Sequence, residues 1–245
     1  MMTPNDTLPP CTQATQADIA LLLEGTFPYV SGGVSSWVNQ IIRAFPEYRF
    51  AIVFLGSRRE DYGAMKYELP GNVVHFEEHF LYDTPVADRI PAARQGDGAA
   101  FALASDLHDH MRNRNAPATA LASFREISRE ILPTGRLSLD DFLHSEAAWE
   151  MVCERYRRFC ADPSFVDFFW TARIMHQPLW QLAKVAQNLI PVRALHAVST
   201  GYAGFLGALL HQSRQLPLIL SEHGIYTKER KIDLFKSEWI RDNRN

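Results

Sequence analysis

A short apolar run that leads through a glycine-containing loop into a helical pattern constrains the fold of this chain most strongly. Residues 18–23 (DIALLL) have the length and composition of a buried strand. Two further runs, 49–55 (RFAIVFL) and 72–76 (NVVHF), predict two more strands. Apolar strands that alternate with a helix are typical of a βαβ unit in a parallel sheet covered on both faces. Between the first two strands, apolar residues recur at the spacing of a helix that buries one face: Val34, Trp37, Val38, Ile41, Ile42 and Phe45.

The strand pattern then stops between about 80 and 187. Helical spacing predicts helices at 101–111, 118–132 and 146–160, and an aromatic stretch follows (SFVDFFWTARIMHQPLW). We interpret this block as a helical insertion packed on the sheet. A separate helical domain is the alternative, although no linker rich in Gly, Ser or Pro marks a boundary.

The sheet pattern resumes with strands predicted at 194–199 and 217–221 and a helix at 200–214. The expected fold class is therefore α/β, a Rossmann-like parallel sheet with flanking helices and a large helical insertion. Residues 1–17 are polar and contain Pro4, Pro9 and Pro10, which predicts a disordered leader before a domain that runs from 18 to 245. The charged residues after 226 have a helical pattern without a terminal cap, which is typical of a fragment.

Composition excludes several classes of protein. The 245 residues carry a formal net charge of −3, which does not favour electrostatic capture of nucleic acid or of an anionic membrane. The N-terminus lacks the basic and apolar regions of a secretory signal, and no apolar run approaches the roughly 18 residues that span a bilayer. The 3 cysteines are too scattered for a disulfide framework or a metal site. A cytoplasmic protein is expected.

The loop from Glu24 to Gly33 is a candidate phosphate site. It follows the carboxyl end of a predicted strand, where ligands bind in open parallel sheets, and it leads into a helix N-terminus, whose free amides attract anions. Gly32 and Gly33 would let the backbone approach a phosphate, and the hydroxyl of Ser31 or Ser35 would add a donor. A tight turn that needs flexible residues is the alternative interpretation. Neither a G-x-G-x-x-G motif nor a phosphate loop of the G-x-x-x-x-G-K-[ST] type is present.

Glu222, His223 and Gly224 follow the last predicted strand and therefore face the same crevice. A histidine there can donate or accept a proton near neutral pH. A loop histidine beside a turn glycine is the simpler alternative. Ser199 also follows a strand, and an N-cap is sufficient to explain it.

Other ionisable residues are not predicted to form a site. The sequence Glu77-Glu78-His79 has metal-ligand chemistry, but no second cluster pairs with it. His108 and His110 are two residues apart and cannot share a helix face. His176 is isolated in the sequence, so ordinary packing or solvation is the expectation for it.

Three motifs, taken in order, resemble a known enzyme family. They are LLLEGTFPYVSGGVSSWVNQII at 21–42, LHAVSTGYAGFLGALL at 195–210 and LILSEHGIYTKERKIDL at 218–234. Together they are similar to the N-terminal half of the retaining, two-domain glycosyltransferases of family GT4, which have the GT-B fold. The resemblance extends from about residue 18 to 245 and includes the helical insertion.

This resemblance implies a function and a set of site residues. Such enzymes transfer a sugar from a UDP-sugar to a glycan acceptor, and the members most similar to this chain build an exopolysaccharide such as Pel in the cytosol, with protein partners at the inner membrane. Ser31, Gly32 and Gly33 would reach the donor diphosphate, and His223 would be the catalytic residue near the transferred sugar. No cofactor, metal or covalent intermediate is expected. The remaining substrate-binding candidates are Glu24, Ser199, Glu222 and Tyr226.

The sequence departs from the family pattern because the donor-binding C-terminal domain is absent from it, so the chain alone is expected to be inactive. Glu24 either serves the acceptor or only holds the loop. Two other functions stay open. One is an inactive Rossmann-like scaffold module that docks a membrane polysaccharide-export complex, and the other is a sugar-nucleotide epimerase with the GT-B fold.

Overall fold

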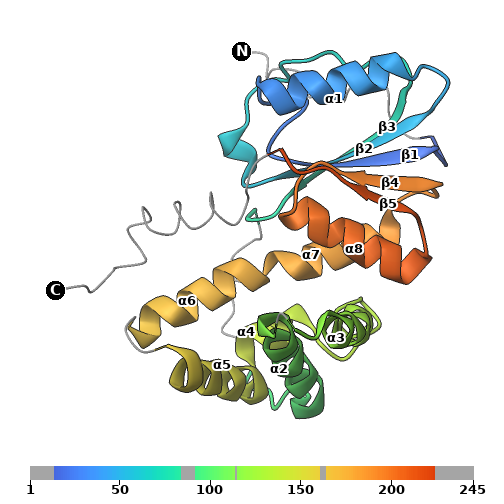
Figure 1. Cartoon of the computed structure of the whole chain (residues 1–245). Coiled ribbons are helices and arrows are strands. Elements are labelled where there is room, and N and C mark those ends of the chain that lie inside the picture. The colour runs from blue at the N-terminus through green and yellow to red at the C-terminus, as the bar shows by residue number, and fades with distance from the viewer. Residues whose placement is uncertain (1–13, 84–91, 114, 161–163, 224–245) are drawn as a thin grey trace. The chain divides into compact units, whose positions relative to one another are not determined.

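The computed structural model describes residues 14–83, 92–113, 115–160 and 164–223, which fall into two compact units. The sheet unit contains the described residues of 14–83 and 188–223, and the helical unit contains those of 92–187 (Figure 1). Among the helices of these described ranges, none has both the length and the apolar character needed to cross a membrane.

The sheet unit is built on five parallel strands in the order β3-β2-β1-β4-β5. The strand order reverses between β1 and β4, which is the point where open α/β sheets form a crevice outside the carboxyl ends of the strands. The predicted α/β class with a parallel, Rossmann-like sheet is therefore confirmed. The strands are β1 (Ile19–Glu24), β2 (Phe50–Gly56), β3 (Val73–Phe80), β4 (Ala194–Ala197) and β5 (Leu218–Leu220).

Helices α1 (Gly33–Ala44) and α8 (Tyr202–Arg214) cover opposite faces of the sheet (Figure 1). Leu21 and Leu23 of β1 join Val38 and Ile42 of α1 in one buried cluster. Leu22 points to the other face, where its Cδ1 atom would lie 3.4 Å from a Cβ placed on Gly207 of α8. Because each fully buried leucine contributes roughly 1.5–3 kcal/mol, the two-sided burial of β1 is a main source of stability.

The helical unit consists of α-helices whose N-termini are mostly capped by side chains. Asp97, Ser138, Ser145 and Ser164 each accept a hydrogen bond from a backbone N–H in the first turn of the helix that follows. The three helices predicted in this block are confirmed to within a few residues. The helices are α2 (Gly98–Arg112), α3 (Pro117–Glu130), α4 (Leu139–His144), α5 (Glu146–Phe159), α6 (Phe165–His176) and α7 (Pro178–Asn188).

The aromatic stretch at 164–180, for which no element boundaries were predicted, forms α6 and the start of α7. Pro178 is the first residue of α7, a position at which the N–H that proline lacks would have no partner within the helix in any case.

Strand β3 continues to Phe80, beyond the predicted end at 76. Polar residues ended the predicted strand, but here they pair with one another and with neighbours. Glu77 accepts hydrogen bonds from the rings of His75 and His79, and Glu78 forms an ion pair of 2.7 Å with Arg59, which begins a short 3-10 helix (Arg59–Asp61). An edge strand tolerates such residues because only one of its edges is paired.

The predicted leader also differs at its end. Residues 1–13 lie outside the described part of the chain, whereas Ala14 donates its N–H to Val74 O at 3.1 Å and Ala17 donates to Pro191 O at 3.0 Å. The ordered domain therefore begins before residue 18. The charged segment after 226 and its predicted helix lie outside the described residues.

Asn72 fixes the end of α1 against the sheet, and its replacement gives a test of the fold. Its side-chain amide donates to the carbonyl oxygens of Ile42 (2.8 Å), Phe45 (3.1 Å) and Tyr48 (3.3 Å). We expect Asn72→Ala to lower the free energy of unfolding by about 1–3 kcal/mol in urea denaturation. Asn72→Asp should lower the free energy of unfolding further, because a carboxylate cannot donate a hydrogen bond to these carbonyl oxygens. Equal stability of Asn72→Asp and wild type would show that the contacts contribute nothing.

Candidate functional site

The N-terminus of α1 is open to solvent at the carboxyl edge of the sheet. Gly32 is its N-cap and has no side-chain hydrogen bond, and the first bond along the helix runs from Ser36 N to Gly32 O at 2.9 Å. The amides before Ser36 therefore have no partner within the helix. Ser31, Gly32 and Gly33 are exposed, whereas Ser35 is buried, so of the two predicted hydroxyl donors only Ser31 faces solvent. Among the residues that the structure describes, no atom would have to move for an anion to reach this helix end.

Neither glycine of the pair is required by the conformation of the loop itself. Gly32 has a φ of 170°, which is extended backbone that any residue adopts, and the described glycines with positive φ are Gly25 (62°) and Gly96 (73°). A Cβ atom on Gly32 or Gly33 would have no atom of the described part of the chain within 4 Å, apart from the neighbouring residues and the helix's own backbone. The tight-turn interpretation therefore applies to Gly25, directly after β1. At Gly32 and Gly33 the absence of a side chain leaves open space at the protein surface, beside the N-terminus of α1.

His223 lies against α1 through an aromatic contact. Its ring meets Trp37 edge-on with centroids 4.4 Å apart, and Trp37 is one helical turn after Gly33. The other ring against Trp37 is His196 of β4, at 5.7 Å, and His196 shares a hydrogen bond of 2.8 Å with Ser221 Oγ. Burial, and then the charge of His223, lower the pKa of His196 below its usual range. The two predicted strand-end features therefore share one rim, as parallel topology requires.

Trp37 and His196 are candidate site residues that the sequence did not single out. Trp37 was counted only as part of the apolar face of a helix, and His196 as part of a strand. An aromatic residue one turn into a helix that follows a glycine loop is the signal that could have identified Trp37. No sequence pattern identifies His196, because its position beside Trp37 follows from the pairing of β1 with β4.

Glu24 connects the end of β1 to the loop after β4. Its carboxylate accepts hydrogen bonds from Ser199 Oγ at 3.0 Å and from the backbone N–H of Ala203 at 3.1 Å, in the first turn of α8. Gly201 lies so close that an added Cβ would be 2.5 Å from Glu24 Oε2. Of the two roles considered for Glu24, the structure shows the loop contact. Glu24 and Ser199 thus form a brace across the switch point of the sheet.

The remaining predicted residues are less informative. Glu222 is exposed next to His223. Tyr226, like Gly224, lies outside the described residues.

A second polar cluster lies on β3, where His75 and His79 both hydrogen-bond to Glu77; we refer to it as the Glu77 brace. His75 Nε2 lies 2.7 Å from one carboxylate oxygen of Glu77, and His79 Nε2 lies 3.0 Å from the other. Burial opposes ionisation of Glu77, but these hydrogen bonds outweigh it and lower the pKa of Glu77 from 4.5 to about 2. Within the part of the chain that the structure describes, no group of three or more His, Cys, Asp or Glu side chains is placed to hold a metal ion.

Comparison with known proteins places the chain in a family. A family model described as a domain of unknown function, DUF3492, matches residues 17–245. The chain belongs to this family. DUF3492 is associated with glycosyltransferases. The match spans the residues of the sheet unit and of the helical unit, so the helical block is part of the DUF3492 domain. Comparisons with curated proteins and with solved structures gave no significant match.

The brace formed by Glu24 can be tested with two glycine substitutions. We expect Gly201→Ala to destabilise the protein by about 1–3 kcal/mol, because its Cβ would push the Glu24 carboxylate away from its hydrogen bonds with Ser199 and Ala203. Gly33→Ala is the matched control, and open space around that position predicts a change within about 0.5 kcal/mol. Thermal and urea unfolding measure both. Similar effects of the two substitutions would contradict the proposed brace.

The Glu77 brace predicts a defined pH dependence. Because the folded pKa of about 2 lies below the ordinary value of 4.5, ionised Glu77 stabilises the fold fully above about pH 4.5, and this contribution is lost as the pH falls through about 2. Glu77→Gln should therefore be less stable than wild type at pH 5, and the difference should shrink toward pH 2. Urea unfolding across this range measures it. A difference that is independent of pH would rule out the carboxylate as its source.

Proposed function

We propose that this DUF3492 chain is the N-terminal, acceptor-side region of a UDP-sugar-dependent retaining glycosyltransferase with the GT-B fold. The observation that carries the proposal is the meeting of the open α1 N-terminus and His223 at one rim, connected through Trp37. The association of DUF3492 with glycosyltransferases supports it. So does the resemblance of three motifs to family GT4.

In this proposal the donor diphosphate approaches the first-turn amides of α1 at Gly33, with the Ser31 hydroxyl as an additional donor. The bond between the anomeric carbon and the UDP oxygen breaks, and a bond to an acceptor hydroxyl forms on the same face of the sugar. The proton of that hydroxyl passes to the departing phosphate. Amides that are already oriented stabilise the negative charge that develops on UDP, which is often the largest catalytic contribution. No metal or covalent intermediate enters this scheme.

His223 would contact the transferred sugar, and its edge-on packing against Trp37 would set the orientation of the imidazole. Glu24 would have a positioning role, because its carboxylate accepts hydrogen bonds from Ser199 and from the start of α8 and so fixes the loop after β4. A second Rossmann-like domain would face this rim and hold most of the nucleotide.

The finer proposal concerns the pathway. The three motifs also resemble the cytosolic glycosyltransferase of the Pel exopolysaccharide system. We therefore propose synthesis of an exopolysaccharide such as Pel in the cytoplasm, with the enzyme brought to the inner membrane by protein partners.

The proposal predicts loss of donor use when the space beside α1 is filled. In the protein that carries this domain together with its second domain, Gly33→Val should reduce transfer from UDP-glucose, UDP-N-acetylglucosamine or UDP-N-acetylgalactosamine at least tenfold while the Tm stays near wild type. Gly71→Val is the matched control, since Gly71 is equally uncrowded but precedes β3, at the opposite end of the strands.

His223→Ala should reduce transfer and leave UDP binding intact.

Two results would overturn the proposal. Unchanged transfer by Gly33→Val would remove the phosphate site, and transfer at the wild-type rate by His223→Ala would make that histidine structural. If no UDP-sugar is consumed by the wild-type protein, the scaffold alternative gains support. Interconversion of two UDP-sugars without transfer would indicate an epimerase.

A further inference from the structure

The helical unit contains a cavity of about 460 Å³ that the sequence analysis did not anticipate. Helices α2, α5 and α6 supply most of its walls, with one residue from α4. This volume is in the range of sites that bind small organic molecules. Most of the lining is apolar and includes Phe142, Val152, Phe159, Phe168 and Met175.

The ionisable part of the lining is biased toward positive charge. Arg112, Arg155, His108 and His176 all line the cavity. Of the residues that the structure describes, Cys160 is the other ionisable one in the lining, and no described aspartate or glutamate belongs to it. Apolar walls with cationic groups on one side match a ligand that has an apolar body and a negatively charged end.

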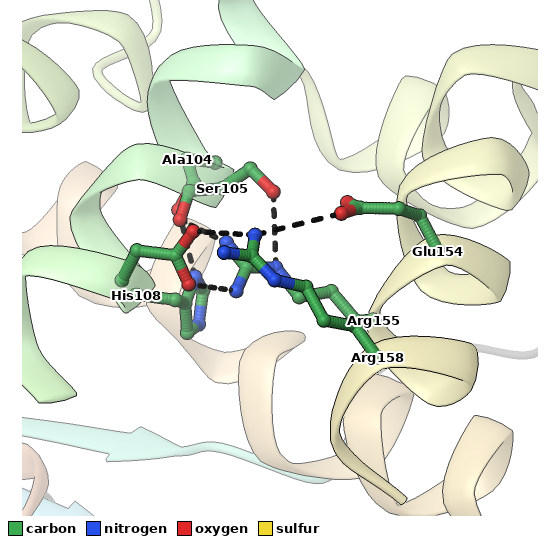
Figure 2. Close-up of polar contacts among 7 residues, drawn as sticks. Ala104, Ser105, His108, Glu154, Arg155 and Arg158 are labelled. Atoms are coloured by element: carbon green, nitrogen blue, oxygen red, sulfur yellow. Dashed lines mark hydrogen bonds and ion pairs between the residues drawn. The ribbon is translucent and has the colours of Figure 1, made fainter.

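Arg155 has a structural role beside this cavity. Its guanidinium reaches from α5 to α2, where it donates to Ser105 Oγ at 2.9 Å and to the Ser105 carbonyl, and it pairs with Asp109 at 2.5 Å. Figure 2 shows this connection, with Arg158 and Glu154 beside it on α5. The charge of Arg155 is therefore neutralised within the helical unit, and Arg155 fixes α2 against α5.

Arg112 is different, because its charge is not neutralised in this way. Its guanidinium lies over the ring of Phe159 at 4.1 Å from the centroid, and within the described ranges no carboxylate lies at ion-pair distance from it. Arg112 is exposed and follows His108 by one helical turn on α2, so the two side chains share a face.

His108 and His176 form a pair that can share one additional proton. Each ring directs Nδ1 at a backbone carbonyl at 2.7 Å, Ala104 O for His108 and Ala172 O for His176, so both Nδ1 atoms carry protons. The two Nε2 atoms face each other at 3.1 Å. Without another proton, two lone pairs meet; with one shared proton they form a hydrogen bond and the pair is cationic. Burial, and then the charge of His108, lower the pKa of His176, and a bound anion would act in the opposite direction.

We propose that this cavity binds an organic carboxylate with an apolar body. The hydrocarbon or aromatic part would occupy the space beside Phe142 and Phe168. The carboxylate would accept hydrogen bonds from Arg112, and the positive charge of the His108–His176 pair, when the two rings share a proton, would attract it. This site lies in the helical unit, and the proposal does not depend on the glycosyltransferase function.

Dodecanoate is a suitable probe, used below its micelle concentration with the whole chain and measured by displacement of the fluorescent dansyl-undecanoate. We expect saturable binding of dodecanoate, and dodecanol of the same chain length should bind at least tenfold more weakly. Arg112→Gln should weaken dodecanoate binding about tenfold, the size expected for one charged hydrogen bond. Arg157→Gln is the matched control, because Arg157 is exposed on α5 and does not line the cavity. Its affinity should equal that of wild type.

A cavity-filling substitution separates this site from general surface adsorption. Ala172 lines the cavity, so Ala172→Phe should abolish saturable binding, with folding checked by circular dichroism. Absence of dodecanoate binding to wild type would overturn the proposal. So would equal affinity for dodecanol, or equal affinity in Arg112→Gln and Arg157→Gln. Unchanged binding by folded Ala172→Phe would place the probe elsewhere and would also overturn it.

Discussion

Strand β1 is paired along both edges and covered on both faces, and the positions of the candidate site residues follow from this arrangement. Its parallel pairing with β2 on one side and β4 on the other sets the carboxyl ends of these strands side by side. Leucines on alternating sides bury it under α1 and α8. A one-residue slip would turn each leucine to the wrong face, so the register is strongly fixed. The loops after β1 and β4 therefore have little freedom in where they begin.

Hydrogen bonds at the end of β1 add to the stabilisation that burial of this strand provides. Where β1 ends, the Glu24 carboxylate takes hydrogen bonds from Ser199 and from the first turn of α8. A carboxylate near a helix N-terminus is favoured by the helix dipole as well as by the bonds themselves. The α1 N-terminus on the other side has no such carboxylate in the described residues and stays exposed. The N-termini of α8 and α1 thus differ. The Glu24 carboxylate accepts a hydrogen bond from the first turn of α8, whereas the first-turn amides of α1 are left to solvent or to a ligand.

Sequence patterns were sufficient for the sheet and for most helices, because apolar periodicity records burial directly. They failed at β3, whose polar end looks unlike a strand in the sequence, because the hydrogen bonds from His75 and His79 to Glu77 are seen only in the structure. In the candidate site, Gly33 and His223 were predicted to share a rim from the general rule for parallel sheets. Trp37, which joins them, was not predicted, since its role depends on which ring lies opposite it.

The sequence by itself determined the α/β class, the position of the glycine loop after the first strand, and the helical block in the middle, since each depends on local spacing and turn chemistry. Only the tertiary structure decided that His196 and His223 meet at Trp37, and that His108 and His176, far apart in the chain, face each other in one cavity. Such contacts depend on the distance between side chains from separate elements, and helix packing and strand order set that distance. This distance cannot be inferred from the residues that neighbour each side chain in the sequence.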